Sequence, residues 1–396
     1  MIDNPFSIQH LPYGVVRFGT TRTHLAVRFE NYAISLDALR RAGLLKPVTL
    51  PESVTRCDSL TSLLELPREQ LSTLRERLAH IISRSDHLNV KGSTVKLAPY
   101  PQDDEKVMCP VRPTDFVDFY CSRHHAYRVG CLFRGPENAL PVQYFDLPIG
   151  YHGRSSTIVV SGTEVPRPCG IRNGEFGATQ RLDYELEVGF VLQGQHGRLT
   201  PDQAWDKIFG VVLVNDWSAR DIQAFEYKPL GPFLGKSFAT TVGAWVTPVE
   251  ALEHWLEPNS DSDHKVLPHL SETRLHHWDL PLNAQLDTGT NQDEICSSNL
   301  RNLAWSAAQM VAHISSNGTV ISAGDLIATG TVSGPEKGAE ACLLERTAGG
   351  KEPLVIGSQT RTYLEDGDTL TLLGGHPGVG LAPCRGTVIA TRDQGE

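Results

Sequence analysis

The chain alternates short apolar runs with turn residues, which is the pattern of a β-rich protein. Near the amino terminus, residues 15–18 and 25–29 are short strand candidates. Six later segments have the same character: 184–192, 209–214, 245–248, 326–329, 369–373 and 386–390. The 35 glycines and 25 prolines supply the turns that so many strands require. The pattern predicts a mainly β fold with a few helices.

Three segments show helical periodicity instead. The first begins near Pro67, and its apolar stripe consists of Leu71, Leu74, Leu78, Ile81 and Ile82. The second is expected to be capped at Thr200-Pro201 and to run through Phe209 to Gly210. The third is expected to start at Ser298 or Asn299 and to end before Gly318, with one face made of Leu300, Leu303, Ala307, Met310, Val311 and Ile314. We interpret that face as structural packing.

The predicted secondary structure changes near residue 100, where the chain becomes more strongly β. Residues 97–101 include two prolines, which resist both helix and central strand, so this stretch is a plausible joint. Residues 1–105 then form one unit of short strands and one clear helix. Residues 106–396 form a second, more strongly β unit. The length of 396 residues also favours more than one domain.

Composition and charge narrow the class of protein. Hydrophobic residues make up 40% and charged residues 21%, as in ordinary globular proteins. A net charge of -10 argues against a nucleic-acid partner and against an anionic membrane surface. We expect no secretory signal and no membrane span, because the first cation is Arg17 and every apolar run is short. Eight scattered cysteines without a C-x-x-C pair indicate reduced thiols, so a cytoplasmic location is expected.

Two acids on one predicted strand carry most of the chemical information. Side chains alternate along a strand, so Glu185 and Glu187 share a face, while Leu186, Val188 and Phe190 point into a core. Neighbouring carboxylates repel each other, and a bound calcium or magnesium ion is the usual remedy. The alternative is a solvated strand face, and the spacing by itself leaves both possibilities open.

Further acids adjoin apolar segments. Asp216 directly follows 211–214, at a strand end. Asp118 is expected on the same side of an extended backbone as Tyr120, whereas Asp115, three residues earlier, could equally be a turn former. Four carboxylates from separate segments would make a sensible calcium shell.

Residues 217–238 offer cations and amides. Ser218 is a suitable N-cap for a helix that places Arg220, Gln223 and Tyr227 on one face, which suits recognition of carboxylates and carbonyls. An ordinary surface helix is the alternative. The following glycine- and proline-rich turn resembles a phosphate loop, but its spacing is wrong and no helix follows. We interpret Lys236 as a cation aimed into a pocket, with a solvated loop lysine as the alternative.

Adjacent His124 and His125 have diverging side chains, so at most one of them is expected at a shared site. Histidine is the commonest general base at neutral pH. Most of the 15 histidines must nevertheless be structural or solvated.

Taken together, these segments resemble the fumarylacetoacetase family, nearly end to end. The matching stretches are Asp118-Phe119-Tyr120, Arg123-x-His125-Ala126, Phe133-Arg134, Pro148-x-Gly150-Tyr151-His152-Gly153-Arg154, Glu185-x-Glu187, 215–223, 227–238 and Gly330-Thr331-x-Ser333-Gly334-Pro335-Glu336. The long block 215–238 is the most specific of them. The resemblance implies a small N-terminal β-barrel domain over 1–105, a larger mixed β-sandwich roll over 106–396 that binds metal and carries out catalysis, and a homodimer.

The resemblance also implies a set of site residues. It implies calcium on Asp118, Glu185, Glu187 and Asp216, and magnesium near Asp216, Lys236 and Thr240. It implies substrate contacts from Tyr120, Arg134, Tyr151, Arg220, Gln223, Tyr227 and Thr331. It makes His125 the general base and Glu345 its orienting partner, with Lys236, Arg220 and Gln223 stabilising developing charge. The implied reaction is hydrolysis of the carbon–carbon bond in 4-fumarylacetoacetate to fumarate and acetoacetate, the last step of tyrosine and phenylalanine catabolism.

One position departs from the family pattern, because Ala239 replaces a common glycine. If that position required positive φ, alanine would be strained there. Two other functions stay open at this point. The chain could be a related diketo-acid hydrolase, such as an acylpyruvate hydrolase, or a non-catalytic calcium-binding protein.

Overall fold

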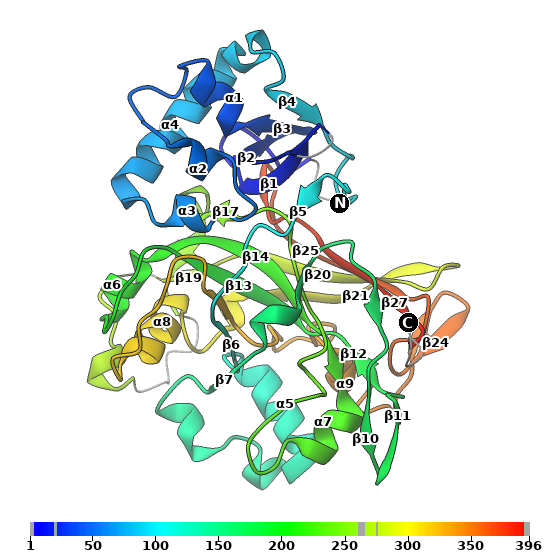
Figure 1. Ribbon diagram of the computed structural model, residues 1–396. Coiled ribbons are helices and arrows are strands. Elements are labelled where there is room, and N and C mark those ends of the chain that lie inside the picture. The colour runs from blue at the N-terminus through cyan, green and yellow to red at the C-terminus, as the bar shows by residue number, and fades with distance from the viewer. Residues whose placement is uncertain (1–3, 20–21, 260–265, 275, 392–396) are drawn as a thin grey trace.

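A computed structural model describes residues 4–19, 22–259, 266–274 and 276–391 (Figure 1). A small N-terminal unit sits on a larger C-terminal unit, and both are built around β-sheets. The prediction of a mainly β fold, with a small N-terminal β unit followed by a larger one, is confirmed. The described part of the chain contains no helix that is long and apolar enough to cross a membrane.

The N-terminal unit is a five-stranded antiparallel sheet in the order β4-β3-β2-β1-β5. Its strands are β1 (Tyr13–Phe18), β2 (Arg22–Phe29), β3 (Tyr32–Ser35), β4 (Thr94–Lys96) and β5 (Val107–Met108). Among the described residues no ladder joins β4 to β5, so the small barrel is open at this seam. The last strand of this sheet, β5, lies just beyond residue 105. It belongs to the N-terminal unit because it pairs with β1 through Val15 and Val16.

Helices cover one side of this sheet. They are α1 (Leu36–Arg41), α2 (Glu52–Thr55), α3 (Thr61–Leu64) and α4 (Arg68–Ser83). The helix predicted near Pro67 is confirmed as α4, and Pro67 occupies its N-cap. All five residues of the predicted stripe are buried. Their burial explains the periodicity, since this stripe packs into the core of the N-terminal unit.

The C-terminal unit is centred on an eight-stranded sheet in the order β7-β6-β22-β13-β14-β16-β8, with β17 also paired to β14. The bounds are β6 (Phe116–Phe119), β7 (Gly150–His152), β8 (Ile158–Val160), β13 (Leu186–Leu192), β14 (Ile208–Asp216), β16 (Thr240–Val242), β17 (Thr247–Pro248) and β22 (Leu326–Ala328). Every residue of β13 and β14 is buried.

Both faces of this central sheet are covered. Along β14, Val211 and Leu213 join the core of the C-terminal unit, while Val212 and Val214 join the core shared with the N-terminal unit. A strand buried on both faces has a continuous apolar sequence rather than an alternating one. This double burial explains why 211–214 contains only leucine and valine.

A six-stranded sheet, in the order β21-β20-β25-β27-β9 with β26 paired to β25, packs against the face opposite the N-terminal unit. Its strands are β9 (Val165–Pro166), β20 (Pro281–Asp287), β21 (Gln292–Asn299), β25 (Thr369–His376), β26 (Val379–Gly380) and β27 (Cys384–Ile389). The two sheets enclose one core that includes the predicted inward residues Leu186, Val188 and Phe190. The predicted orientation of these three side chains is confirmed.

Short pairs of strands and several helices lie around these two packed sheets. The pairs are β10 (Cys169–Arg172) with β11 (Glu175–Ala178), β12 (Leu182–Asp183) with β15 (Ser218–Ala219), β18 (Leu256–Glu257) with β19 (His277–Trp278), and β23 (Leu354–Ile356) with β24 (Gln359–Arg361). The helices are α5 (Arg123–Arg134), α6 (Pro201–Trp205), α7 (Arg220–Glu226), α8 (Ala307–Ser315) and α9 (Leu343–Arg346).

Two helix predictions were wrong in their bounds. Thr200 does cap α6 through a capping box, but the helix ends at Trp205, because Ile208 already pairs with Leu192 in the central sheet. Residues 298–302 are the end of β21 and a short 3-10 helix, so α8 begins at Ala307 behind the N-cap Ser306. In both segments, strand pairing outweighed the local helical pattern.

Candidate active site

The strands that carry the predicted acids all present them at one edge of the central sheet. β13 and β14 are antiparallel, so the start of β13 lies beside the end of β14. β22 is antiparallel to β13 and parallel to β6, which brings the end of β6 to the same edge. Glu185, Glu187, Asp216 and Asp118 occupy these strand ends. Topology therefore brings together acids that lie far apart in the sequence.

These four carboxylates form a compact buried cluster. Each offers an oxygen, and the four oxygens lie within 4.8 Å of one another. Glu187 is fully buried, and Asp118, Glu185 and Asp216 are nearly so. The solvated strand face that the spacing alone left open is therefore excluded for Glu185 and Glu187.

Two of the four acids have no direct ion pair with a cation among the described residues. Asp118 Oδ1 and both carboxylate oxygens of Glu187 are buried without a hydrogen-bond partner. Burial raises the pKa of the Asp118 carboxyl, and the charge of Asp216 raises it further. Burial likewise raises the pKa of Glu187, with added contributions from Asp118 and Glu185. Such a group is costly in a folded protein unless a cation fills the space between the oxygens.

The other two acids are paired with cations. Lys236 Nζ lies 2.5 Å from both Glu185 Oε2 and Asp216 Oδ2, and Arg220 Nη1 lies 2.8 Å from Glu185 Oε1. Burial alone would lower the pKa of the Lys236 amine, but the charges of Asp216 and Glu185 raise it above its usual value. Lys236 therefore remains an ammonium and points into the site, as predicted from its glycine- and proline-rich turn.

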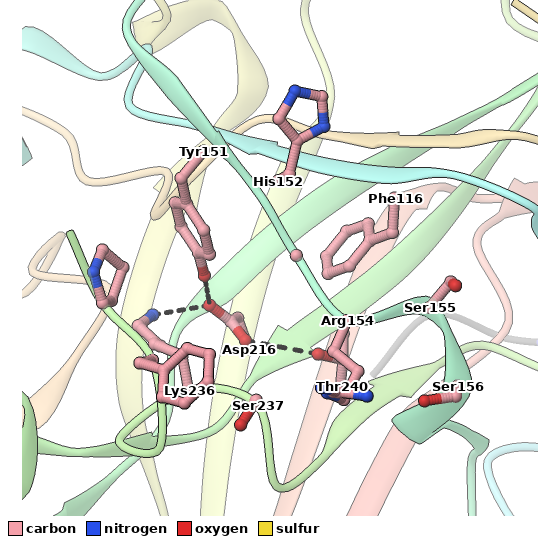
Figure 2. Close-up of a pocket in the computed structure, with 13 residues that line it drawn as sticks. Phe116, Tyr151, His152, Arg154, Ser155, Ser156, Asp216, Lys236, Ser237 and Thr240 are labelled. Atoms are coloured by element: carbon pink, nitrogen blue, oxygen red, sulfur yellow. Dashed lines mark hydrogen bonds and ion pairs between the residues drawn. The ribbon is translucent and has the colours of Figure 1, made fainter. Parts of the chain in front are cut away.

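Asp216 also lines a pocket beside the acid cluster, which is shown in Figure 2. Tyr151 donates its hydroxyl to Asp216 Oδ2 at 2.8 Å, and Thr240 donates to Asp216 Oδ1 at 3.3 Å. This pocket of about 290 Å³ lies against Lys236 and Asp216 and includes Ser237. The Lys236 ammonium has no lone pair to offer, so a metal ion here would draw its ligands from Asp216, Thr240 and backbone oxygens.

His125 lies on α5 with its ring held by a buried acid. Ser122 caps the helix and accepts the backbone N–H of His125. The ring Nδ1 lies 2.5 Å from Glu345 Oε2. A carboxylate on Nδ1 fixes the tautomer and leaves Nε2 as the nitrogen that accepts a proton. His125 lines the main pocket, whereas its neighbour His124 is absent from that lining.

Glu345 is itself held in place by three further side chains. Its Oε1 accepts a hydrogen bond from Arg128 Nη1 at 3.5 Å. Its Oε2 accepts Ser333 Oγ at 2.7 Å and Cys342 Sγ at 3.2 Å. Burial alone would raise the pKa of Glu345, but the charge and hydrogen bond of His125 and the bonds from Ser333 and Cys342 lower it. Glu345 is thus a fixed carboxylate that orients the imidazole.

The main pocket has a volume of about 420 Å³, and residues of the acid cluster line it together with His125. The structure brings all seven predicted substrate-contact residues to its wall: Tyr120, Arg134, Tyr151, Arg220, Gln223, Tyr227 and Thr331. Asp118, Glu185, Lys236 and His125 line the same cavity, and apolar residues such as Ile149 and Leu344 complete it. A mostly apolar cavity with a few converging charges is typical of a small-molecule site.

Contacts with the backbone fix two of these wall residues, Thr331 and Arg134. Gly330 has a φ of 75°, and a Cβ there would lie 2.1 Å from the carbonyl oxygen of Phe119. Only glycine permits this approach, which seats Thr331 beside the end of β6. The Arg134 guanidinium donates to the carbonyls of Asn138 at 3.0 Å and Ala139 at 2.6 Å.

Several local predictions are corrected by the structure. Ser218 is not an N-cap: it lies in β15, and its hydroxyl donates to the carbonyl of Asp216. The helix α7 begins at Arg220, after Ala219. Asp115 is exposed and takes no part in the acid cluster. Ala239 is unstrained, because the non-glycine residues with positive φ in the described chain are Leu11, Glu30, Ser85, Asn173 and Ala348.

Three residues around the site were not predicted from the sequence. Ser333 and Cys342 hold Glu345, and Asp183 is fully buried beside Arg220. A signal for Asp183 did exist, because residues 183, 185 and 187 follow the strand alternation that identified Glu185 and Glu187. Ser333 lies in the matching stretch 330–336, but the resemblance gave it no role. Cys342 lies three residues before Glu345, at the N-cap of α9, a position that is recognised only once the start of this helix is known.

The donor set fits a hard divalent cation. Four carboxylate oxygens converge, and Lys236 and Arg220 neutralise charge only on Glu185 and Asp216. Asp118 and Glu187 have no ion pair among the described residues, so a divalent ion bound between the oxygens would supply the positive charge that their ionised forms lack. Oxygen ligands of this kind favour calcium, magnesium or manganese over softer metals.

Comparison with known proteins identifies the family. Residues 9–110 match the fumarylacetoacetase N-terminal domain, and residues 115–389 match the fumarylacetoacetate (FAA) hydrolase C-terminal domain. The chain is 38% identical to the fumarylacetoacetase of Arabidopsis thaliana, over 98% of this chain and 96% of that protein. It is 37% identical to the fumarylacetoacetase of Homo sapiens, over 98% of this chain and 97% of that protein.

Solved structures share the fold at lower identity. The fumarylacetoacetate hydrolase of Exiguobacterium antarcticum aligns with a TM-score of 0.58 and 17% identity, covering 96% of this chain and 99% of that one. A structure of Cg1458 with inhibitor aligns with the same TM-score at 13% identity, covering 96% of this chain and 100% of that one. With two domain matches that span nearly all of its length, the chain belongs to the fumarylacetoacetate hydrolase family.

Proposed function

We propose that this protein is a metal-dependent fumarylacetoacetase, which hydrolyses a carbon–carbon bond in 4-fumarylacetoacetate to give fumarate and acetoacetate. One observation supports this proposal above all: His125, whose ring is held by Glu345, lines the same cavity as Asp118 and Glu185 of the acid cluster. A non-catalytic calcium-binding protein has no use for a buried imidazole oriented by a carboxylate. Relatives that match almost the whole chain carry the same name.

The first step is activation of water by His125. Glu345 holds Nδ1, so Nε2 removes a proton from a water molecule in the pocket. The water oxygen bonds to a ketone carbon of the substrate, and the carbonyl electron pair moves onto its oxygen. Holding the imidazole, the water and the ketone in one cavity replaces a collision of separate molecules by a reaction within a complex.

The second step breaks the carbon–carbon bond. The carbonyl re-forms as the carboxyl group of fumarate, and the bonding pair departs as the enolate of acetoacetate. The imidazolium of His125 returns its proton to that carbon, so the base is restored. Arg220 Nη2 is buried without a hydrogen-bond partner, which suits it to donate to the oxygen on which negative charge develops. Lys236 and Gln223 face the same cavity and contribute to this stabilisation.

The walls of the cavity hold the substrate. Tyr120, Tyr151, Tyr227, Arg134 and Thr331 offer hydroxyl and guanidinium groups to a molecule that carries two carboxylates and two keto groups. We assign calcium to Asp118, Glu185, Glu187 and Asp216, and magnesium to the pocket beside Asp216 and Thr240. Bound there, a divalent ion supplies Lewis-acid polarisation of the keto oxygens. The family resemblance further implies a homodimer, and the eight free cysteines favour a reducing, cytoplasmic location.

The proposal is tested by following the ultraviolet absorbance of fumarylacetoacetate with and without a chelator. We expect the absorbance to fall with the purified protein, the chelated protein to lose this activity, and calcium with magnesium to restore it. An acylpyruvate assayed in parallel should react far more slowly. Faster turnover of the acylpyruvate would reassign the substrate, and no turnover of either compound would overturn the proposal.

A further inference from the structure

Asp183 is a buried carboxylate that the mechanism above leaves without a role. It is fully buried at the end of β12, two residues before Glu185. Four N–H groups donate to it: the backbone amides of Tyr184, Leu343 and Leu344, and Nε of Arg220. Four donors and no acceptor around one carboxyl group fit its ionised form.

Two of these bonds anchor the helix that carries Glu345. The amides of Leu343 and Leu344 lie 2.7 and 2.9 Å from the Asp183 oxygens. They are the first two amides of α9, and the N-cap residue of this helix, Cys342, provides no capping hydrogen bond. First-turn amides need an acceptor from elsewhere when the N-cap provides none. Asp183, 160 residues away in the sequence, is that acceptor.

A third bond anchors the Arg220 guanidinium of the site. Arg220 Nε lies 2.8 Å from Asp183 Oδ2. With Nε fixed, Nη1 is set between Glu185 Oε1 at 2.8 Å and Gln223 Oε1 at 3.2 Å. The planar guanidinium then has one defined orientation, and the direction of Nη2 follows from it.

We infer that Asp183 is a positioning residue that sets the base-orienting Glu345 and the charge-stabilising Arg220 relative to each other. The Asp183 carboxylate is bonded both to the start of α9, which carries Glu345, and to Arg220, so these two parts of the site do not move independently of each other. The catalytic consequence of this inference rests on the proposed hydrolase function. The anchoring of α9 and Arg220 is a structural statement and can be measured without any substrate.

The test compares Asp183→Asn with a matched control, Asp368→Asn. Asp368 is also buried, accepts Nε and Nη2 of Arg361 at 2.9 and 3.0 Å, and accepts one backbone amide. Neither Asp368 nor Arg361 lines the main pocket. Each substitution removes one buried aspartate–arginine pair, so a general loss of stability should be similar in the two variants.

We expect Asp183→Asn to lower kcat by about 10²-fold, since misplacement of catalytic groups by about 1 Å has that effect. KM should rise as well, because Arg220 faces the substrate. Asp368→Asn should lower the melting temperature but leave kcat and KM near wild type. A kcat within twofold of wild type in Asp183→Asn, or equal kcat losses in the two variants, would overturn the inference.

Hydrogen–deuterium exchange provides a readout that is independent of the reaction. The amides of 343–346 should exchange faster in Asp183→Asn than in wild type, and at the wild-type rate in Asp368→Asn. If the wild type fails to hydrolyse fumarylacetoacetate, the proposed function fails, whereas unchanged exchange in Asp183→Asn refutes the positioning role. Asp183→Glu retains the charge should the asparagine variant not fold. It should still lose kcat at least about tenfold, because its carboxylate is displaced by one methylene.

Discussion

The chemistry of His125 depends on how its ring is held rather than on its position in the sequence. An imidazole whose Nδ1 meets a fixed carboxylate presents Nε2 to the pocket as a base. Its neighbour His124 does not line the pocket. The sequence could say that these two side chains diverge, but it could not say which of them faces the site. That choice required the fold, or the resemblance to a family.

Replacing His125 by alanine should abolish most of the turnover without unfolding the protein. Loss of a general base typically lowers the rate by about 10²–10⁴-fold, so we expect kcat to fall at least about a hundredfold. Metal binding should persist, because His125 lies outside the carboxylate cluster. Stopped assays of kcat, with circular dichroism to check the fold, measure both effects.

The matched control is His124→Ala on the same helix. This variant should turn over close to the wild-type rate, because His124 does not line the pocket. Near-normal turnover in His125→Ala, or equal losses in the two variants, would contradict the assignment of His125 as the base.

At the scale of a single element, β13 shows what strand alternation can and cannot predict. Alternation correctly placed Glu185 and Glu187 on one face, opposite Leu186 and Val188. It could not show that Asp118 and Asp216 meet them, because this depends on the order of β6, β22, β13 and β14 in the sheet. Strand order is set by long-range pairing, and no local pattern records it.

Glu187→Ala should weaken calcium binding, because both of its oxygens are buried without a hydrogen-bond partner. Glu187 is also one of the two cluster acids that have no direct ion pair among the described residues. Isothermal titration calorimetry should show an affinity at least about tenfold lower, a loss of about 1.4 kcal/mol in binding free energy.

Asp115→Asn provides the control for this measurement. Asp115 lies three residues before Asp118 but is exposed and outside the cluster, so calcium affinity should stay at the wild-type value. Unchanged affinity in Glu187→Ala would rule out the carboxylate shell. Equal losses in the two variants would point to long-range charge instead of direct coordination.

The mispredicted helices also belong to the scale of elements. The segment 298–302 has the apolar spacing of a helix, yet its backbone completes β21 and a 3-10 turn before α8 begins. The true start was encoded in the capping box Ser306-x-x-Gln309. The apolar periodicity continued upstream of that cap because Leu300 and Leu303 pack into the same core.

For the whole molecule, the contact between the two units is a feature that the sequence indicated only indirectly. The core residues of the N-terminal unit, such as Leu25 and Leu74, join Val212 and Val214 of the central sheet in one cluster. The unbroken apolar run 211–214 implied burial on both faces. Which element covers the second face was not readable, because it lies some hundred residues away in the chain.

His10 ties these two units together and makes their contact sensitive to acid. Nδ1–H of the buried, neutral ring donates to the Pro5 carbonyl at 3.0 Å, Nε2 accepts the Thr247 hydroxyl of β17 at 2.8 Å, and the ring stacks on Phe6. Burial lowers the pKa of His10 from 6.5 to about 3, against the opposing effect of the Pro5 hydrogen bond. The unfolded chain therefore binds a proton between these two pH values that the folded chain does not.

The sign of the effect follows from that difference in proton binding. His10 contributes its full stabilisation above pH 6.5, and the contribution declines as the pH falls toward 3. Between pH 7.5 and 5.5 wild type should lose about 1.4 kcal/mol of unfolding free energy from this group, and His10→Gln should not. Urea titrations at both pH values should show the gap between wild type and variant shrinking by that amount. The exposed His80 on α4 provides the control, since His80→Gln removes no buried ring. A gap between wild type and His10→Gln that stays constant would mean that His10 binds its proton equally in the folded and unfolded protein, and that the contact between the units does not respond to acid through this residue.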